Sequence, residues 1–157
     1  MESFPKKEIF RFYGFVSYKK DNSPRPIYEI NTEELIKILD DFIKYKDYFE
    51  NPPEEAYEMD NRDYSKCKQA NEILQLLYKH EIHDTQYHPK LERMKKMYNK
   101  NTSFELSREK LRLDEIFIIL TWIHRQERWC GGAFYEAIKN KTFYRLLRRM
   151  EEIRNEL

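Results

Sequence analysis

The chain has 157 residues, enough for one domain with a substantial apolar core. Its 29 Lys and Arg residues nearly balance its 28 Asp and Glu residues, and the net charge of +1 gives no global argument for a nucleic acid or a membrane as partner. The longest apolar run, Ile116 to Ile123, is too short to span a bilayer. We therefore expect a single globular domain over residues 1–157.

The first 30 residues form a segment unlike the rest. Residues 9–18 are aromatic and β-branched, residues 19–26 are rich in turn formers, and a short apolar run covers residues 27–30. This pattern predicts a β-hairpin or an extended arm. The N-terminus has neither the basic nor the apolar region of a signal peptide, and only Cys67 and Cys130 are present, so we expect reduced thiols in the cytoplasm.

From residue 31 onward the apolar residues recur at helical spacing. Asn31 or Thr32 can cap a first helix, which should end before Asn51-Pro52-Pro53. Further helices should follow the caps Asp63, Asp114 and Thr142, and others should begin near Pro89 and at Ala133. On the helix that begins near Pro89, the inward residues should include Met94, Met97 and Tyr98. The expected fold is all-α, a compact bundle of five or six helices over residues 31–157.

The most distinctive stretch runs from Leu120 to Gly132. A largely apolar helix leads into Arg125-x-Glu127-Arg128-Trp129-Cys130 and then into two of the three glycines in the chain. Two adjacent glycines predict a sharp end to this helix. We refer to this bend as the corner.

The corner and the segments after it resemble a known family. The matching residues are Leu120-Thr121-Trp122-Ile123, Arg125-x-Glu127-Arg128-Trp129-Cys130-x-Gly132, Ala137-Ile138-Lys139-Asn140-x-Thr142 and Leu146-Leu147-Arg148-Arg149-Met150. Over residues 33–153 the chain resembles an uncharacterised bacterial domain-of-unknown-function family. It departs from that family's pattern at Gln126, Trp129, Gly131 and Lys141. The resemblance implies a small, soluble, mostly helical protein of a bacterium or phage, and it implies no activity.

Three charged residues at the corner have two interpretations. Arg125 and Arg128 share one helix face and could clamp an anion, with Glu127 as a base or an orienting group. In the structural interpretation, which we prefer, Glu127 accepts hydrogen bonds from the next helix. Cys130 could be a nucleophile with His124 as its base, but we favour a buried, inert Cys130 because His124 lies more than a helical turn away.

His80, His83 and His88 form a spacing that could bind zinc, with Asp84 inside it. No cysteine lies nearby to complete such a site, so we expect these histidines to be the polar end of a helix, and we expect no metal or other cofactor.

Basic residues without acidic neighbours lead into the last helix. They are Lys139, Lys141, Arg145, Arg148 and Arg149. With a second basic segment, residues 90–100, they could follow a nucleic-acid backbone, or they could form a solvated face. The segment Glu50–Asp63 is acidic and could instead dock a basic protein.

No catalytic constellation emerges, and the composition is rich in the aromatic and arginine residues that interfaces favour. We therefore expect a non-enzymatic interaction module that binds a protein in preference to nucleic acid and has no membrane partner. Such a module could be an accessory protein of a phage or mobile element, for example an inhibitor of a host defence effector. The alternatives are an enzyme or anion-binding protein built on the corner, and direct RNA or DNA binding through the basic C-terminal helices.

Overall fold

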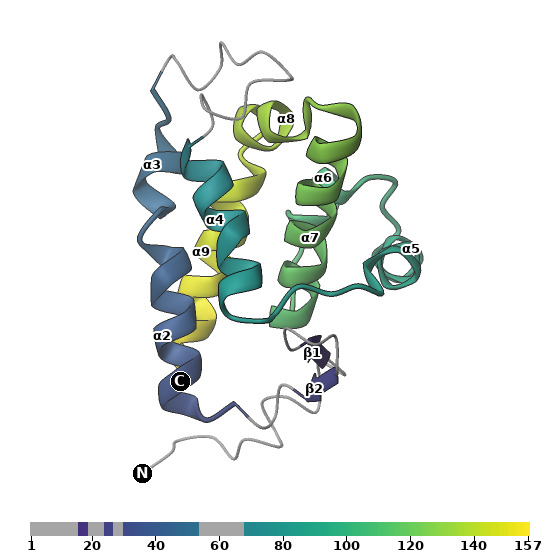
Figure 1. The fold of residues 1–157 in the computed structure, drawn as a ribbon. Helices are drawn as coiled ribbons and strands as arrows, with labels where there is room; N and C mark the ends of the chain where they lie inside the picture. The colour runs from purple at the N-terminus through teal and green to yellow at the C-terminus, as the bar shows by residue number, and fades with distance from the viewer. Residues whose placement is uncertain (1–15, 19–23, 27–29, 54–67) are drawn as a thin grey trace.

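The protein is mostly helical in a computed structural model, which describes residues 16–18, 24–26, 30–53 and 68–157 (Figure 1). The described part contains eight helices. They are α2 (Thr32–Ile43), α3 (Lys46–Glu50), α4 (Lys68–Lys79), α5 (Tyr87–Tyr98), α6 (Ser103–Leu106), α7 (Leu113–Cys130), α8 (Ala133–Lys139) and α9 (Thr142–Glu156). The all-α prediction is thus confirmed. The predicted count of five or six helices is wrong, because α2 and α3 are separate and α6 is a single extra turn.

The strands observed near the N-terminus do not match the residues of the predicted hairpin. Two three-residue strands, β1 (Val16–Tyr18) and β2 (Pro24–Pro26), pair antiparallel with Val16 opposite Pro26. The second of them lies in the stretch expected to be a turn. Ile30, expected to end the second strand, is fully buried in the hydrophobic core instead. The predicted strand residues 9–15 and 27–29 lie outside the described residues.

The first helix begins at the capping residue that the sequence predicts, and two later helices do not. Asn31 caps α2 as predicted, since its Oδ1 accepts the backbone N–H of Glu34 at 2.7 Å. The expected caps Asp114 and Thr142 are wrong: Arg112 caps α7, and Lys141, with φ of 68°, precedes α9. Asp63 and Cys67, expected at the start of α4, lie outside the described residues.

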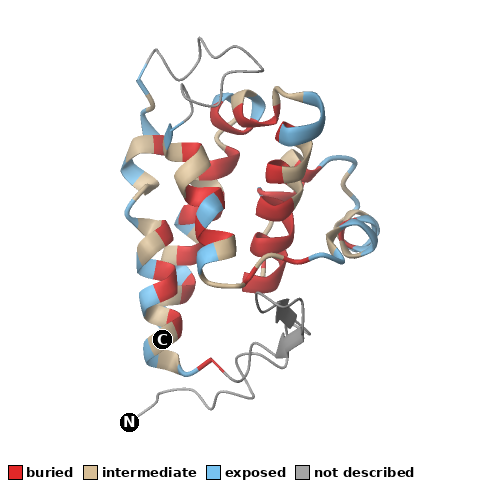
Figure 2. Cartoon of the chain, viewed as in Figure 1, coloured by how far each residue is buried: buried red, intermediate tan, exposed pale blue. Residues whose placement is uncertain are grey.

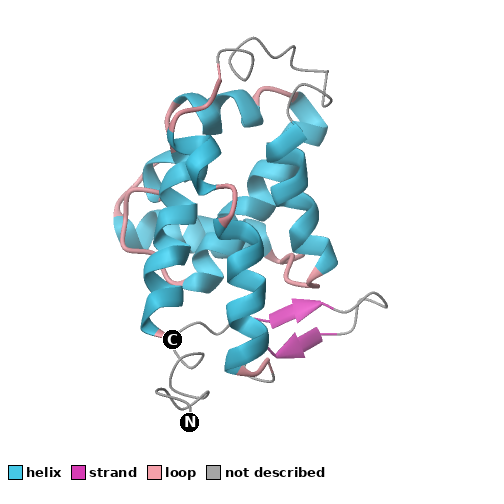
Figure 3. Cartoon of the chain, turned by 90° about the vertical axis from the view of Figure 1, so that its left-hand side faces the viewer, coloured by secondary structure: helices cyan, strands magenta, loops and turns pink. Residues whose placement is uncertain are grey.

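Helix α7 is the centre of the fold. Every residue from Leu113 to Thr121 is buried, on all faces of the helix, as expected for a helix surrounded by others. Helices α4, α5, α8 and α9 contact it, and α9 also packs against α2, α3 and α8. The buried residues of these helices face one another in Figure 2, and the view in Figure 3 shows the same bundle from the side. The expected stripe of α9 forms part of this core, from Phe143 to Ile153.

Two exceptions interrupt the apolar core pattern. Met97 of α5 was expected to face inward but is 60% exposed. Trp129, at the end of α7, is 80% exposed. Helix α5 lies at the edge of the bundle (Figure 1), and no other described helix covers Met97 in its last turn. Among the described helices, none combines the length and the apolar character that a bilayer crossing requires.

Candidate functional site

The corner between α7 and α8 is formed by two glycines in conformations that other residues avoid. Gly131 has φ of 72° and Gly132 has φ of 85°. A side chain at either position would raise the energy of this backbone, so the pair allows α8 to begin directly after α7. The sequence predicted this break.

Glu127 holds the corner together from inside. It is buried on α7, and its Oε1 accepts the backbone N–H of Phe134, in the first turn of α8, at 3.0 Å. Burial raises the pKa of Glu127, and the backbone N–H groups of Phe134 and Gly132 partly offset this by lowering it. This carboxylate therefore supplies the acceptor that the start of α8 lacks.

The two arginines of the corner differ in their exposure to solvent. Arg128 is exposed, whereas Arg125 is half-buried with its Nε shielded from solvent. No described residue offers an acceptor to that Nε, and no described carboxylate forms an ion pair with either guanidinium. Among the described residues, the positive charges of Arg125 and Arg128 on α7 are thus not offset by an ion pair.

A hollow of about 450 Å³ opens beside Arg128. Its described lining residues are Asn71, Gln75, Tyr78, His124, Arg128 and Phe134. None of these is acidic, and all but Phe134 carry a hydrogen-bonding group. The hollow therefore suits a group with oxygen acceptors and negative charge.

His124 forms the inner wall of this hollow. It is 7% exposed, and its Nδ1 lies 3.1 Å from the hydroxyl of Tyr78 on α4. Burial, followed by the charges of Arg128 and Arg125, lowers the pKa of His124 to about 4. The imidazole is therefore neutral at physiological pH. His83 also stacks on Tyr78, with 4.7 Å between ring centroids.

Cys130 is exposed, so the expectation of a buried thiol is wrong. It is the last residue of α7, and Arg128, Trp129 and Cys130 are exposed in succession there. The core packing of α7 ends at Glu127, where the chain turns away into α8. We define the corner surface as the hollow together with Arg128, Trp129 and Cys130.

The three candidate zinc ligands do not converge. His80 pairs with Asp41 of α2, with Nε2 and Oδ2 2.8 Å apart, while His83 stacks on Tyr78 and His88 packs edge-on against Tyr87. Within the part of the chain that the structure describes, no three metal-binding side chains cluster.

We call Lys139, Lys141, Arg145, Arg148 and Arg149 the basic stripe. Most of these residues make contacts within the protein. The Nζ of Lys141 donates to the backbone carbonyl of Glu50, Arg145 donates to Ser107 Oγ at 3.1 Å, and Arg149 donates to the carbonyl of Leu111 at 2.7 Å. Lys139 and Arg148 are exposed, and the ammonium of Lys139 lies over the ring of Tyr135. Of the acidic segment Glu50–Asp63, residues 50–53 are described, and Glu50 at its start is the residue that contacts the stripe through Lys141.

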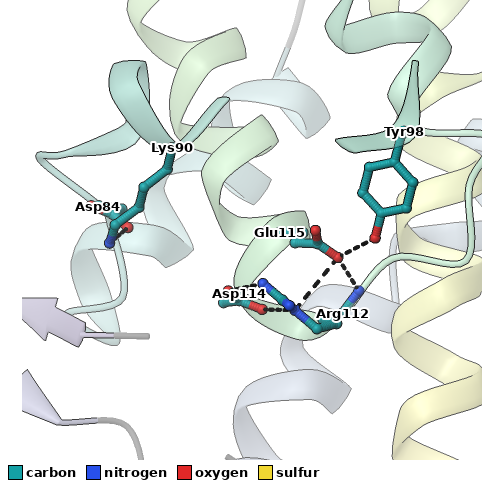
Figure 4. Close-up of polar contacts among 6 residues, drawn as sticks. All are labelled: Asp84, Lys90, Tyr98, Arg112, Asp114 and Glu115. Carbon is teal, nitrogen blue, oxygen red and sulfur yellow. Dashed lines mark hydrogen bonds and ion pairs between the residues drawn. The ribbon is translucent and has the colours of Figure 1, made fainter. Parts of the chain in front are cut away.

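A second polar cluster, at the other end of α7, was missed by the sequence reasoning (Figure 4). Arg112 forms two hydrogen bonds with Asp114, at 3.2 and 3.1 Å, and Tyr98 of α5 donates to Glu115 at 2.8 Å. Nearby, Lys90 pairs with the fully buried Asp84 at 2.6 Å. The signal was present in the sequence, since two acidic residues in the first turn of an otherwise apolar buried helix need partners.

The fold and the site together define a small all-α protein with a cationic corner at the end of its central helix. The chain belongs to a family of unknown function, DUF6508, whose model matches residues 28–156. The expected membership in an uncharacterised family is thereby confirmed. No curated protein and no solved structure matches the chain.

Proposed function

We propose that this protein is a non-enzymatic interaction module that binds a partner protein through the corner surface. The observation that carries this proposal is the position of Trp129, which is 80% exposed directly after the exposed Arg128. Leaving an indole in water is unfavourable, and Trp and Arg are the residues most enriched among those that dominate binding energies. A partner that covers both would bury a large apolar area next to a charge.

The partner segment that fits this surface is acidic. Arg125 and Arg128 have no carboxylate partner among the described residues, and the described lining of the hollow contains none. Carboxylates of a partner would find the guanidinium of Arg128 and the amides of Asn71 and Gln75 there. Complementary charge of this kind sets the orientation of a complex and raises the rate of association.

A protein partner is favoured over nucleic acid by the contacts of the basic stripe. Arg145 and Arg149 direct their Nε donors to Ser107 and to the carbonyl of Leu111. Both guanidinium groups therefore already donate hydrogen bonds within the protein, whereas binding to nucleic acid would require them to contact phosphates. The proposed cellular setting, an accessory protein of a phage or mobile element that inhibits a host defence effector in the cytoplasm, is supported only by the family resemblance.

The proposal is tested by affinity capture with two matched variants. Wild-type protein, Trp129→Ala and Met97→Ala are each used as bait in a host lysate, and the captured proteins and nucleic acid are quantified. Both variants remove an exposed apolar side chain, so Met97→Ala controls for a general loss of nonspecific apolar binding. We expect a protein that is lost with Trp129→Ala and retained with Met97→Ala. Capture of nucleic acid alone, or of the same proteins by all three baits, would contradict the proposal.

A second candidate function is the binding of a small oxyanion in the hollow, with or without chemistry on it. The observation that favours it is the neutral, hydrogen-bonded His124 beside Arg128. Titration with inorganic phosphate, followed by the imidazole resonances of His124, tests this candidate. A bound anion would raise the pKa of His124, because it offsets the arginine charges that lower it.

A further inference from the structure

Two side-chain amides follow one face of α4 beside the corner. Asn71, Gln75 and Tyr78 are four and three residues apart, so they share one face of this helix, and all three line the hollow. Gln75 is exposed and Asn71 is half-buried, so a ligand can reach both carboxamides. Neither carboxamide forms a hydrogen bond with a described residue. Within the described part of the chain, both amides are therefore available to a ligand.

The acidic residue of α4 does not face the hollow. Glu72 lies between the two amides in the sequence, but it points about a quarter turn away from them around the helix. Its carboxylate accepts the hydroxyl of Tyr45 at 2.7 Å and lies 3.8 Å from the ammonium of Lys68. The charge that the described lining presents to a ligand is therefore that of Arg128.

Arg128 faces the two amides from α7. The hydroxyl of Tyr78 and Nδ1 of His124 lie 3.1 Å apart, and this contact fixes the two helices at one level. Helices α4 and α7 run in opposite directions (Figure 1), so the hollow extends from this contact back along α4 and forward along α7. Arg128 is about 6 Å beyond His124 in this direction. Gln75 and Asn71 are about 4.5 and 10.5 Å beyond Tyr78, so Arg128 is level with the space between them.

The spacing of the two amides matches that of an extended peptide. Asn71 and Gln75 are about 6 Å apart along α4. In an extended chain, a residue presents its N–H and its C=O on the same edge, and the next residue on that edge is two positions further, about 6.6–6.8 Å away. A carboxamide has both a donor and an acceptor, so it can pair with both groups of one such residue. Two carboxamides one helical turn apart can therefore bind alternate residues of one strand.

We propose that the acidic segment of the partner binds as an extended strand along α4. Asn71 and Gln75 form hydrogen bonds with the main chain of two alternate residues, and Arg128 pairs with the carboxylate of the residue between them. Arg128 is exposed and its side chain is long, so it reaches a carboxylate that points out of the hollow. A helical segment does not fit, because its main-chain groups already bond with one another. This inference rests on the proposed function and adds the conformation that the partner segment adopts.

The proposal is tested by titrating the isotope-labelled full chain with the blocked peptide Thr-Val-Glu-Val-Thr and following the side-chain amide resonances of Asn71 and Gln75. We expect saturable shifts of both. N-methylation of the two valines removes the N–H groups that face α4 and should weaken binding by about fivefold or more. N-methylation of the glutamate, whose N–H faces away from α4, should change the affinity by less than about twofold. Equal effects of the two modifications would overturn the proposal.

Variants of the protein test the same contacts from the other side. Asn71→Ala and Gln75→Ala should each weaken peptide binding by about fivefold or more. Gln86→Ala, which removes an exposed carboxamide outside the hollow, should leave the affinity unchanged. Alanine favours a helix, and neither carboxamide of α4 supports a contact with the described residues, so both variants should fold like the wild type.

Failure of this inference and failure of the proposed function give different results. Peptide binding that is lost in Arg128→Glu but unaffected by Asn71→Ala and Gln75→Ala would overturn the extended strand and leave the proposed function standing. The absence of saturable peptide binding would also overturn the extended strand. If, in addition, the lysate yields no protein whose capture depends on Trp129, the proposed function fails as well.

Discussion

Glu127 and Phe134 join the two helices of the corner: the carboxylate of Glu127 accepts the backbone N–H of Phe134 at 3.0 Å, seven residues further along the chain. Glu127, the acidic residue of the corner, thus stabilises the fold from inside. The arginines on either side of Glu127 point to a different use, because Arg128 lines the hollow and the buried Nε of Arg125 has no acceptor among the described residues.

Replacing Glu127 should therefore affect stability. Glu127→Ala removes the acceptor for the start of α8 and should lower the free energy of unfolding by about 2 kcal/mol, whereas Glu127→Gln retains an acceptor and should lose about half as much. Urea unfolding followed by circular dichroism measures both. Equal stability of the alanine variant and the wild type would show that this contact does not support the corner.

The stability of the protein should depend on pH through two groups that act in opposite directions. Burial raises the pKa of Asp114 to about 6 despite its hydrogen bonds with Arg112, while burial and two arginines lower the pKa of His124 to about 4. Between pH 4 and 6, the folded state holds the Asp114 proton more tightly than the unfolded state, so this contribution to stability falls as pH rises. For His124 the unfolded state holds the proton more tightly, so stability rises with pH up to about 6.5.

Single variants should separate these two contributions. In His124→Asn, the free energy of unfolding should fall by roughly 2–3 kcal/mol between pH 4 and 6; in Asp114→Asn, it should rise by a similar amount between pH 4 and 6.5. Urea unfolding across this pH range provides the measurement. The same slope in both variants would mean that the environments of these side chains are not as described.

The basic stripe of α9 offers a direct comparison between an arginine that is used internally and one that is not. Arg149 bonds to the carbonyl of Leu111 at 2.7 Å and to Glu152 at 3.0 Å, while Arg148 is exposed. Arg149→Ala should lower the free energy of unfolding by about 1–2 kcal/mol, and Arg148→Ala should change it by less than about 0.5 kcal/mol. Thermal or urea unfolding distinguishes them. Equal effects would restore the interpretation of the stripe as a uniformly solvated face.

Local signals in the sequence predicted the features that depend on a few neighbouring residues. Asn31 as a helix cap, the break at Gly131 and Gly132, and the buried stripe of α9 are examples, because capping, positive φ and helical periodicity are encoded locally. The interruption between α2 and α3 at Lys44 and Tyr45 was missed, since neither residue is a helix breaker.

Features that depend on packing between distant segments could not be predicted in this way. The meeting of Tyr78 with His124 joins residues of α4 and α7, and the contact of Tyr98 with Glu115 joins α5 and α7. Cys130 and Met97 each sit at helical spacing that suggests burial, yet both are exposed because no described element covers them. Periodicity identifies a face of a helix, but the arrangement of the other helices decides how far along the helix that face is covered.

Binding of an acidic partner segment to the corner surface is measured by titrating the protein with a glutamate-rich peptide while following tryptophan fluorescence, to which the exposed Trp129 should respond. We expect a saturable change that weakens as salt increases, is lost in Arg128→Glu, and persists in Arg148→Glu, which reverses the charge of another exposed arginine. Undiminished binding by Arg128→Glu, or no saturable change with the wild type, would contradict it.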